Sequence, residues 1–239
     1  MSVEPMSPRA RTAGPEIRSI TDTRDIAEGI RLYRTVFHTP DTECTMAPRL
    51  LAAMARHGGF VLGAHRDRSL IGFAYGFAGI TTHGLGAHLY LQLIAVHPRY
   101  QNSGIGRSLM NAVAEHARAA GISRIRWAFD PRDTRNAHFY LDVVGARGKW
   151  FVPDMYGTPN SHRVIAEWDA APVTRARPHT TTPTDDSVEL REDLGTEHQP
   201  DEPFYTRLAN LLSTGYELVS CSVGDQESRW RLCHTREHN

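Results

Sequence analysis

Residues 101–108, Gln-Asn-Ser-Gly-Ile-Gly-Arg-Ser, are the stretch whose residue types and spacing best suit binding chemistry. They follow a run of β-formers at 91–96 and lead into an amphipathic helix that contains Leu109 and Val113. A strand that breaks through glycine into a helix directs several backbone N–H groups at one spot, at the positive end of the helix dipole. The pattern therefore predicts a cradle for a phosphate or pyrophosphate.

Two common nucleotide motifs do not describe this stretch. A P-loop needs a lysine and a hydroxyl residue after its last glycine, and a dinucleotide-binding fold needs Gly-x-Gly-x-x-Gly after its first strand. The sequence instead has Gln101-x-x-Gly104-x-Gly106 behind a strand that ends Val96-His97-Pro98. This order resembles the acyl-coenzyme A signature of the GNAT acyltransferase superfamily, Gln/Arg-x-x-Gly-x-Gly/Ala.

Further segments carry the same resemblance. Residues 127–146 are similar to a second GNAT signature, and with Met155-Tyr156-Gly157 and 164–168 they resemble a bacterial subgroup of GNAT proteins. That subgroup has a C-terminal strand–helix–hairpin extension, which 188–235 resemble. The resemblance implies transfer of an acyl group, usually acetyl, from coenzyme A to a small-molecule amine in a ternary complex. It also implies acetyl-CoA or another acyl-CoA as co-substrate and, since such proteins are often dimers, a homodimer.

The resemblance also indicates where the co-substrate would bind. Two parallel strands, 88–96 and 124–129, would part, and the backbone of Ile94, Ala95 and Val96 would pair with the pantetheine arm and polarise the thioester carbonyl. The amides that would hold the pyrophosphate belong to Gln101, Asn102, Ser103, Gly104, Ile105, Gly106, Arg107 and Ser108.

Acyl transfer to an amine needs few side chains, because a neutral amine attacks a thioester directly and positioning supplies most of the acceleration. A base must still remove the ammonium proton. His88, Tyr90 and Gln92 alternate onto one strand face. The family position that often holds glutamate falls on Tyr90, but a phenol with a pKa near ~10 is a weak base. A histidine such as His88 has an ordinary pKa near neutral pH, which suits a general base. The alternative for His88 is a strand-edge histidine that only meets solvent.

The proton donor is less clearly marked. Many family members use a tyrosine four residues before the glycine corresponding to Gly145, where this chain has Leu141. Tyr140 is the adjacent candidate, although one residue along a helix is a rotation of about 100 degrees. Asn136, at the predicted helix start, would bond the pantetheine or cap the helix.

Four arginines, Arg124, Arg126, Arg132 and Arg135, form a basic run on the predicted strand 124–129 and the turn after it. They form a solvated face, or they hold an adenosine 3′-phosphate or an acidic substrate. Two other functions stay open. If the substitutions at the base and acid positions have removed catalysis, the chain is a non-catalytic acyl-CoA-binding interaction module. If the acceptor is a polypeptide, the chain is a protein N-acetyltransferase.

Composition excludes several classes of protein. The 239 residues are 40% hydrophobic and 23% charged with a formal net charge of zero, so no overall field attracts nucleic acid or a membrane. No apolar run approaches the ~18 residues that a membrane span needs. The cysteines Cys44, Cys221 and Cys233 are too few for a disulfide framework, which favours the cytoplasm. Cys221, Cys233 and His234 lack zinc-site spacing, so no metal is expected.

Periodicity and turn residues predict the fold class α/β (α+β), with a mixed, mostly antiparallel sheet, splayed parallel central strands and flanking helices. One helix is predicted to start at Asp22, one to end at Gly121 and a short one to cover 135–144 before Gly145. We expect a disordered lead at 1–14, the acyltransferase domain at 15–169, a Pro/Thr-rich linker at 170–187 and a small strand–helix–hairpin extension at 188–235. Gly72, Gly76 and Gly79 interrupt the predicted strand 70–80, which indicates bulges, a closely approaching backbone or ordinary irregularity.

Overall fold

The structure is a computed structural model and describes residues 14–39, 46–81, 86–170, 186–193, 202–224 and 227–235. Most of the predicted lead and linker, and Cys44, lie outside the described residues. None of the helices within the described residues combines the length and the apolar character that a membrane span requires. The main-domain elements are β1 (Glu16–Ser19), α1 (Thr23–Phe37), α2 (Pro48–Arg56), β2 (Gly59–Arg66), β3 (Ser69–Ile80), β4 (Ala87–Val96), η1 (Pro98–Tyr100), α3 (Ile105–Ala119), β5 (Arg124–Phe129), α4 (Thr134–His138), η2 (Phe139–Val144), β6 (Arg147–Val152) and β7 (Arg163–Asp169). The C-terminal elements are β8 (Ser187–Asp193), α5 (Glu202–Ser213), β9 (Tyr216–Val223) and β10 (Glu227–His234).

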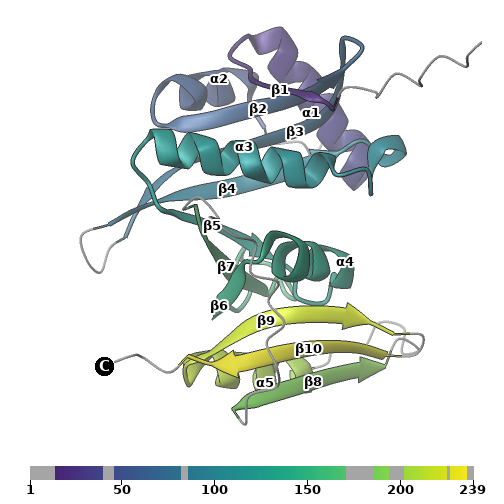
Figure 1. Cartoon of the computed structure of the whole chain (residues 1–239), viewed down its shortest axis with the longest axis vertical. Coiled ribbons are helices and arrows are strands. Elements are labelled where there is room, and N and C mark those ends of the chain that lie inside the picture. The colour runs from purple at the N-terminus through teal and green to yellow at the C-terminus, as the bar shows by residue number, and fades with distance from the viewer. Residues whose placement is uncertain are drawn as a thin grey trace, which may run out of the picture.

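The described strands form one sheet in the order β1-β2-β3-β4-β5-β7-β6-β9-β10-β8. All neighbours are antiparallel except β4 and β5, which are parallel. Helices α1 and α2 cover one face of the N-terminal half and α3 covers the other (Figure 1). This arrangement confirms the predicted mixed sheet with a parallel central pair.

The two parallel strands are hydrogen-bonded only at one end. Their register pairs Leu89 with Ile125 and Tyr90 with Arg126, and there it stops, although both strands run on. Figure 1 shows β4 and β5 diverging from this paired end. The predicted splay is therefore present and begins immediately after Tyr90.

A bulge and a glycine shape β4 where it leaves β5. The register with β3 shifts because Tyr75 pairs with Leu93 whereas Gly76 pairs with Leu91, which leaves Gln92 as the extra residue. Such a bulge bends its strand. A Cβ at Gly76 would lie 2.1 Å from the carbonyl oxygen of Tyr90, so the two backbones approach too closely for any side chain.

Two hydrophobic clusters hold the sheet between its helices. On one face, α1 contributes Ile26 and Ile30 and α2 contributes Leu51. On the other face, α3 buries Leu109 and Val113, which recur at helical spacing. Helix α1 begins where predicted, because the Asp22 carboxylate accepts a hydrogen bond from the Arg24 amide at 2.7 Å.

The helix expected at 135–144 differs from the prediction. It is α-helical only over α4 and continues as the π-helix η2, which closes at Gly145 with a φ of 84°. Its cap is Asp133, whose carboxylate accepts a hydrogen bond from the Asn136 amide at 3.0 Å. The capping role considered for Asn136 is therefore wrong: the Asn136 amide nitrogen Nδ2 instead donates to Asp133 at 2.7 Å.

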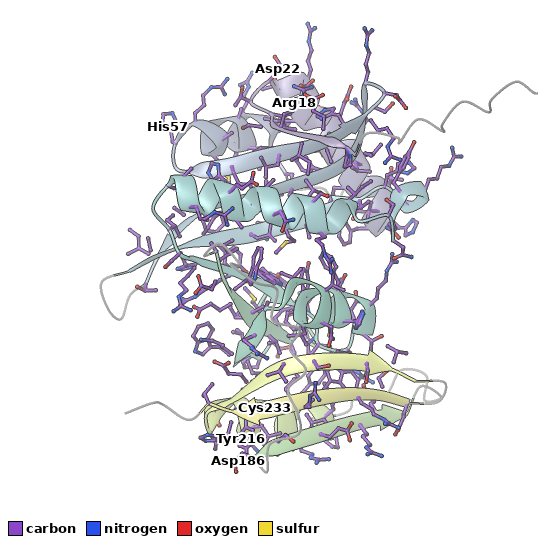
Figure 2. The ribbon with its side chains drawn as sticks, viewed as in Figure 1. Arg18, Asp22, His57, Asp186, Tyr216 and Cys233 are labelled. Atoms are coloured by element: carbon purple, nitrogen blue, oxygen red, sulfur yellow. The ribbon has the colours of Figure 1, made fainter. Side chains whose placement is uncertain are left out.

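The C-terminal module consists of β8, α5, β9 and β10, which is the same strand–helix–strand–strand order as β5, α4/η2, β6 and β7. In each unit the last strand lies between the other two, as β10 does between β8 and β9 and β7 between β5 and β6. The C-terminal module joins the main sheet where Leu218 of β9 pairs with Gly148 of β6. Trp230 donates a hydrogen bond to the Pro131 carbonyl oxygen at 2.9 Å. Tyr216 and Cys233 lie near each other at one end of the module's strands (Figure 2). The module thus docks on the main domain, while its exact boundaries stay a prediction.

Replacing Gly76 with alanine should destabilise the fold by about 3 kcal/mol, because the new Cβ meets rigid backbone at Tyr90 and the ring of Phe60. Gly72→Ala on the same strand is the matched control. Its Cβ would meet side-chain atoms of Leu109, Ala64 and Ile105 at 3.0, 3.1 and 3.1 Å rather than a backbone oxygen, so it should cost about 1 kcal/mol. Urea unfolding measures both variants, and equal losses would contradict the close approach of β3 and β4.

Candidate active site

The predicted cradle is an open helix N-terminus. Gly104 adopts a left-handed conformation with a φ of 85°, and α3 begins at the next residue. The first backbone bond within the helix runs from the Ser108 amide to the Gly104 carbonyl at 3.0 Å. The amides of Ile105, Gly106 and Arg107 precede this bond, and no side chain caps the helix. Since no heavy atom lies within 4 Å of a Cβ built on Gly104, the cradle has room for an anion.

Side-chain hydrogen bonds connect this cradle to the other half of the molecule. The Gln101 side chain donates to the Val96 carbonyl oxygen at 3.0 Å and accepts a hydrogen bond from Arg135 at 2.7 Å. Arg107 donates to the Val143 carbonyl oxygen at 3.3 Å. Of the basic run, Arg135 therefore lies beside the cradle. Both arginines place positive charge where a phosphate would bind.

The strand expected to hold the pantetheine arm leads directly into the cradle. Ala95 is buried and Ile94 and Val96 are half-buried. Because the pairing of β4 with β5 ends at Tyr90, these three residues have no register partner on β5. The structure thus brings together the predicted backbone of 94–96 and the predicted amides of 101–108.

His88 lies on β4 before the splay. Its pKa is lowered from the usual histidine value, first by burial and then by the Arg126 charge, while Glu167 acts in the opposite direction. Its Nδ1 atom has no hydrogen-bond partner among the described residues. His88 precedes Ile94 by six residues, or ~20 Å along a strand. A proton can reach it from the splayed strands only through intervening water.

Tyr90 occupies the last paired position, at the start of the splay. Burial, with Tyr156 nearby, raises its pKa to about 12, and a hydrogen bond with the Ala128 backbone only partly opposes this. Tyr90 therefore keeps its proton at neutral pH. Its ring also packs against the Phe77 ring, with 5.4 Å between the two ring centroids.

Tyr140 is placed in the core. It is 8% exposed and its ring packs against Trp127 at 5.0 Å and Phe129 at 5.7 Å. Burial raises its pKa well above the ordinary phenol value. This position does not suit the expected proton donor, which has to meet a leaving thiolate. Asn136 is exposed and engaged with Asp133.

A charged cluster around Glu167 lies on the sheet face of Tyr90. The sequence analysis named its members Arg124 and Arg126 but not Glu167 or Lys149. Glu167 on β7 accepts from Arg126 at 2.8 Å and pairs with Lys149 at 3.0 Å and Arg124 at 3.3 Å. Hydrogen bonds from Lys149 and Arg126 lower the pKa of Glu167 although burial opposes this shift. The signals available in the sequence were the acid inside the apolar strand 163–169 and the single lysine of the chain.

A cavity of about 570 Å³ lies farther along, between β6 and α5. Lys149 and Trp150 line it next to the charged cluster, and Phe151, Pro153 and Tyr205 line its apolar part. Glu217 on β9 pairs with Lys149 at 3.3 Å. The C-terminal module therefore contributes both a wall of this cavity and a partner of the cluster.

Sequence and structure comparisons identify the class of protein. Residues 26–146, just over half of the chain, match the acetyltransferase (GNAT) family. The chain therefore belongs to the GNAT acetyltransferase family, which confirms the resemblance and the expected type of enzyme. Among curated proteins, none matches the chain in sequence.

Solved structures share the fold. A GNAT-family protein from Desulfovibrio desulfuricans aligns with a TM-score of 0.55 at 22% identity, covering 66% of this chain and 99% of that one. YncA of Salmonella typhimurium, solved with acetyl-CoA, aligns with a TM-score of 0.54 at 18% identity, covering 66% and 95%. Ard1 of Thermoplasma volcanium aligns with a TM-score of 0.51 at 18% identity, covering 66% and 98%.

The charges around His88 predict opposite effects of two substitutions. Arg126→Gln should raise the pKa of His88 because it removes a nearby positive charge, whereas Glu167→Gln should lower it because it removes a negative one. NMR titration of the histidine rings measures both. His116, whose pKa is lowered by burial alone, is the internal reference. Shifts of the same sign in the two variants would contradict this arrangement.

Proposed function

We propose that the protein transfers an acetyl or other short acyl group from coenzyme A to the amine of a small molecule. The observation that carries the proposal is the parting of β4 and β5 after Tyr90, beside the uncapped N-terminus of α3. A parted parallel pair offers unpaired backbone groups to an extended arm, and an open helix N-terminus attracts a diphosphate. Together these two features suit acyl-CoA along its length.

The residues present fit this co-substrate. The amides from Gln101 to Ser108 would hold the pyrophosphate, with Arg107 and Arg135 adding positive charge. The backbone of Ile94, Ala95 and Val96 would pair with the pantetheine arm. When bound, acyl-CoA supplies an activated thioester carbonyl. The acceptor nitrogen forms a bond to that carbon as the carbon–sulfur bond breaks, which leaves an amide and a thiolate.

His88 and Tyr90 are the side chains proposed to manage protons. His88 has a lowered pKa, so it is neutral near pH 7 and can take the ammonium proton through water. Tyr90 stays protonated, so it acts as a hydrogen-bond donor at the start of the splay. Tyr140 is proposed to support the wall behind β5. The thiolate is a good leaving group, and solvent can return its proton. The cytoplasm and a homodimer stay as expectations.

Gly104→Val should weaken coenzyme A binding about tenfold or more, because a β-branched residue at positive φ costs ~1–2 kcal/mol and distorts the first turn of α3. Gly121→Val is the matched control. Gly121 also has positive φ and open space, but it follows the other end of α3. Calorimetric titration with coenzyme A should show unchanged affinity for Gly121→Val. Equal weakening in both variants would contradict a cradle at Gly104.

His88→Gln should lower kcat about 100-fold, at the low end for loss of a general base, and remove the rise of the rate with pH. Thiol release from acetyl-CoA measures the rate. His57→Gln is the control, since His57 lies at the end of α2 in the N-terminal half (Figure 2). Unchanged turnover in His88→Gln would remove His88 from the mechanism.

Two other outcomes would favour the alternative functions. Coenzyme A binding with no thiol release in the presence of any amine would favour the non-catalytic module, and turnover with peptides alone would favour a protein acetyltransferase.

A further inference from the structure

The acceptor side of the proposed site carries a row of cross-strand neighbours on one sheet face. Tyr90 pairs in register with Arg126, Arg126 with Glu167, and Glu167 with Arg147. Directly paired residues project from the same face. The charged cluster around Glu167 therefore continues from the start of the splay toward β6.

The cluster presents positive charge to a ligand. The Glu167 side chain is only 6% exposed and is covered by Arg124, Arg126 and Lys149, which we call the cationic patch. Glu217 pairs with Lys149 and is the second carboxylate. Asp169 and Arg147, the register partners of Arg124 and Glu167, add one charge of each sign, so the cluster keeps one positive charge in excess. Arg124 is half exposed, so its guanidinium keeps donors directed to solvent. An incoming ammonium meets the outer cations rather than the enclosed carboxylate.

Apolar surface lies next to the cationic patch. The Trp150 ring packs 4.6 Å from the Arg126 guanidinium carbon and is 43% exposed. Phe77 is 39% exposed beside Tyr90, and Tyr156 is 54% exposed. Arg163, which lies over Tyr156, pairs with Asp130 and adds no net charge. A ligand on this face thus meets aromatic rings and cations together.

The spacing between this patch and the reaction centre limits the acceptor. Arg126 is level with Tyr90, and Arg124 precedes the pair of Leu89 with Ile125 but extends to Glu167 at 3.3 Å. The thioester carbonyl is proposed at Ile94, four residues or ~13 Å along β4 from Tyr90. An acid on the cationic patch and an amine at the thioester must therefore be several bonds apart. An α-amino acid, with both groups on neighbouring carbons, is too short.

We infer that the acceptor is an amine with a carboxylate at the far end of an apolar spacer, and that the cationic patch binds this carboxylate. The inference rests on the proposed acyl transfer and names its substrate class. The exposed rings hold the spacer, and the excess charge disfavours polyamines and aminoglycosides, which are polycations.

Three amines with the same six-carbon straight chain test the inference with the full-length protein and saturating acetyl-CoA. Hexylamine has no acid, norleucine has its acid beside the amine, and ε-aminocaproate has its acid at the far end. Thiol release should give ε-aminocaproate a kcat/KM at least about tenfold above the other two, since a charged hydrogen bond is worth that much. Spermidine should be the poorest of the set.

Other outcomes separate the two proposals. Turnover of hexylamine, norleucine or spermidine at or above that of ε-aminocaproate would overturn the substrate class and leave acyl transfer standing. No thiol release with any amine would overturn the proposed function, and the inference with it.

Arg124→Gln tests the patch itself. It should bring the kcat/KM ratio of ε-aminocaproate to hexylamine near one, and Arg124→Lys should restore part of it because the charge returns. A purely structural role would lower both rates and keep their ratio. Arg18→Gln is the control: Arg18 pairs with Asp25 at 3.4 Å in the N-terminal half (Figure 2), and the ratio should not change. A ratio kept in Arg124→Gln would overturn the proposed carboxylate site, because Arg124 is the most exposed cation of the patch and the one argued to keep donors for a ligand.

Discussion

The structure depends on the interruption of hydrogen bonding between two parallel strands. Buried backbone groups are almost always paired, so strands that part after two residue pairs need other support. The bulge at Gln92 bends β4 away, and the absence of a side chain at Gly76 lets β3 follow it closely. On β5, Trp127 and Phe129 pack on Tyr140 and anchor that strand to the C-terminal half. The two halves are therefore held apart by packing on each side.

The same interruption organises the proposed chemistry. At one end of the parted strands, the left-handed turn at Gly104 begins α3 without a cap and leaves its amides open to an anion. On the face of Tyr90, arginines and a lysine enclose Glu167. In the proposed reaction, binding of a diphosphate and recognition of an acceptor would thus use different surfaces that meet at the splay. The C-terminal module reinforces the second surface through Glu217 and the wall formed by α5.

Much of this architecture could be predicted because its signals are local. The Asp22 cap, the glycines at 121 and 145 and the 101–106 motif each determine a turn or a helix end within a few residues. The pairing of Arg124 and Arg126 with Glu167 could not be predicted, since these arginines are 43 and 41 residues away and the contacts depend on strand register. The π-helix was also missed, because no local residue pattern marks the extra residue in its turn. It packs against β9, which lies far along the chain.

A crystal structure of the complex with coenzyme A tests the central claim most directly. The account predicts the pantetheine arm between β4 and β5, hydrogen-bonded to the backbone of Ile94 to Val96, with the pyrophosphate on the amides that begin α3. A complex in which coenzyme A occupies the cavity between β6 and α5, with β4 and β5 paired beyond Tyr90, would contradict it.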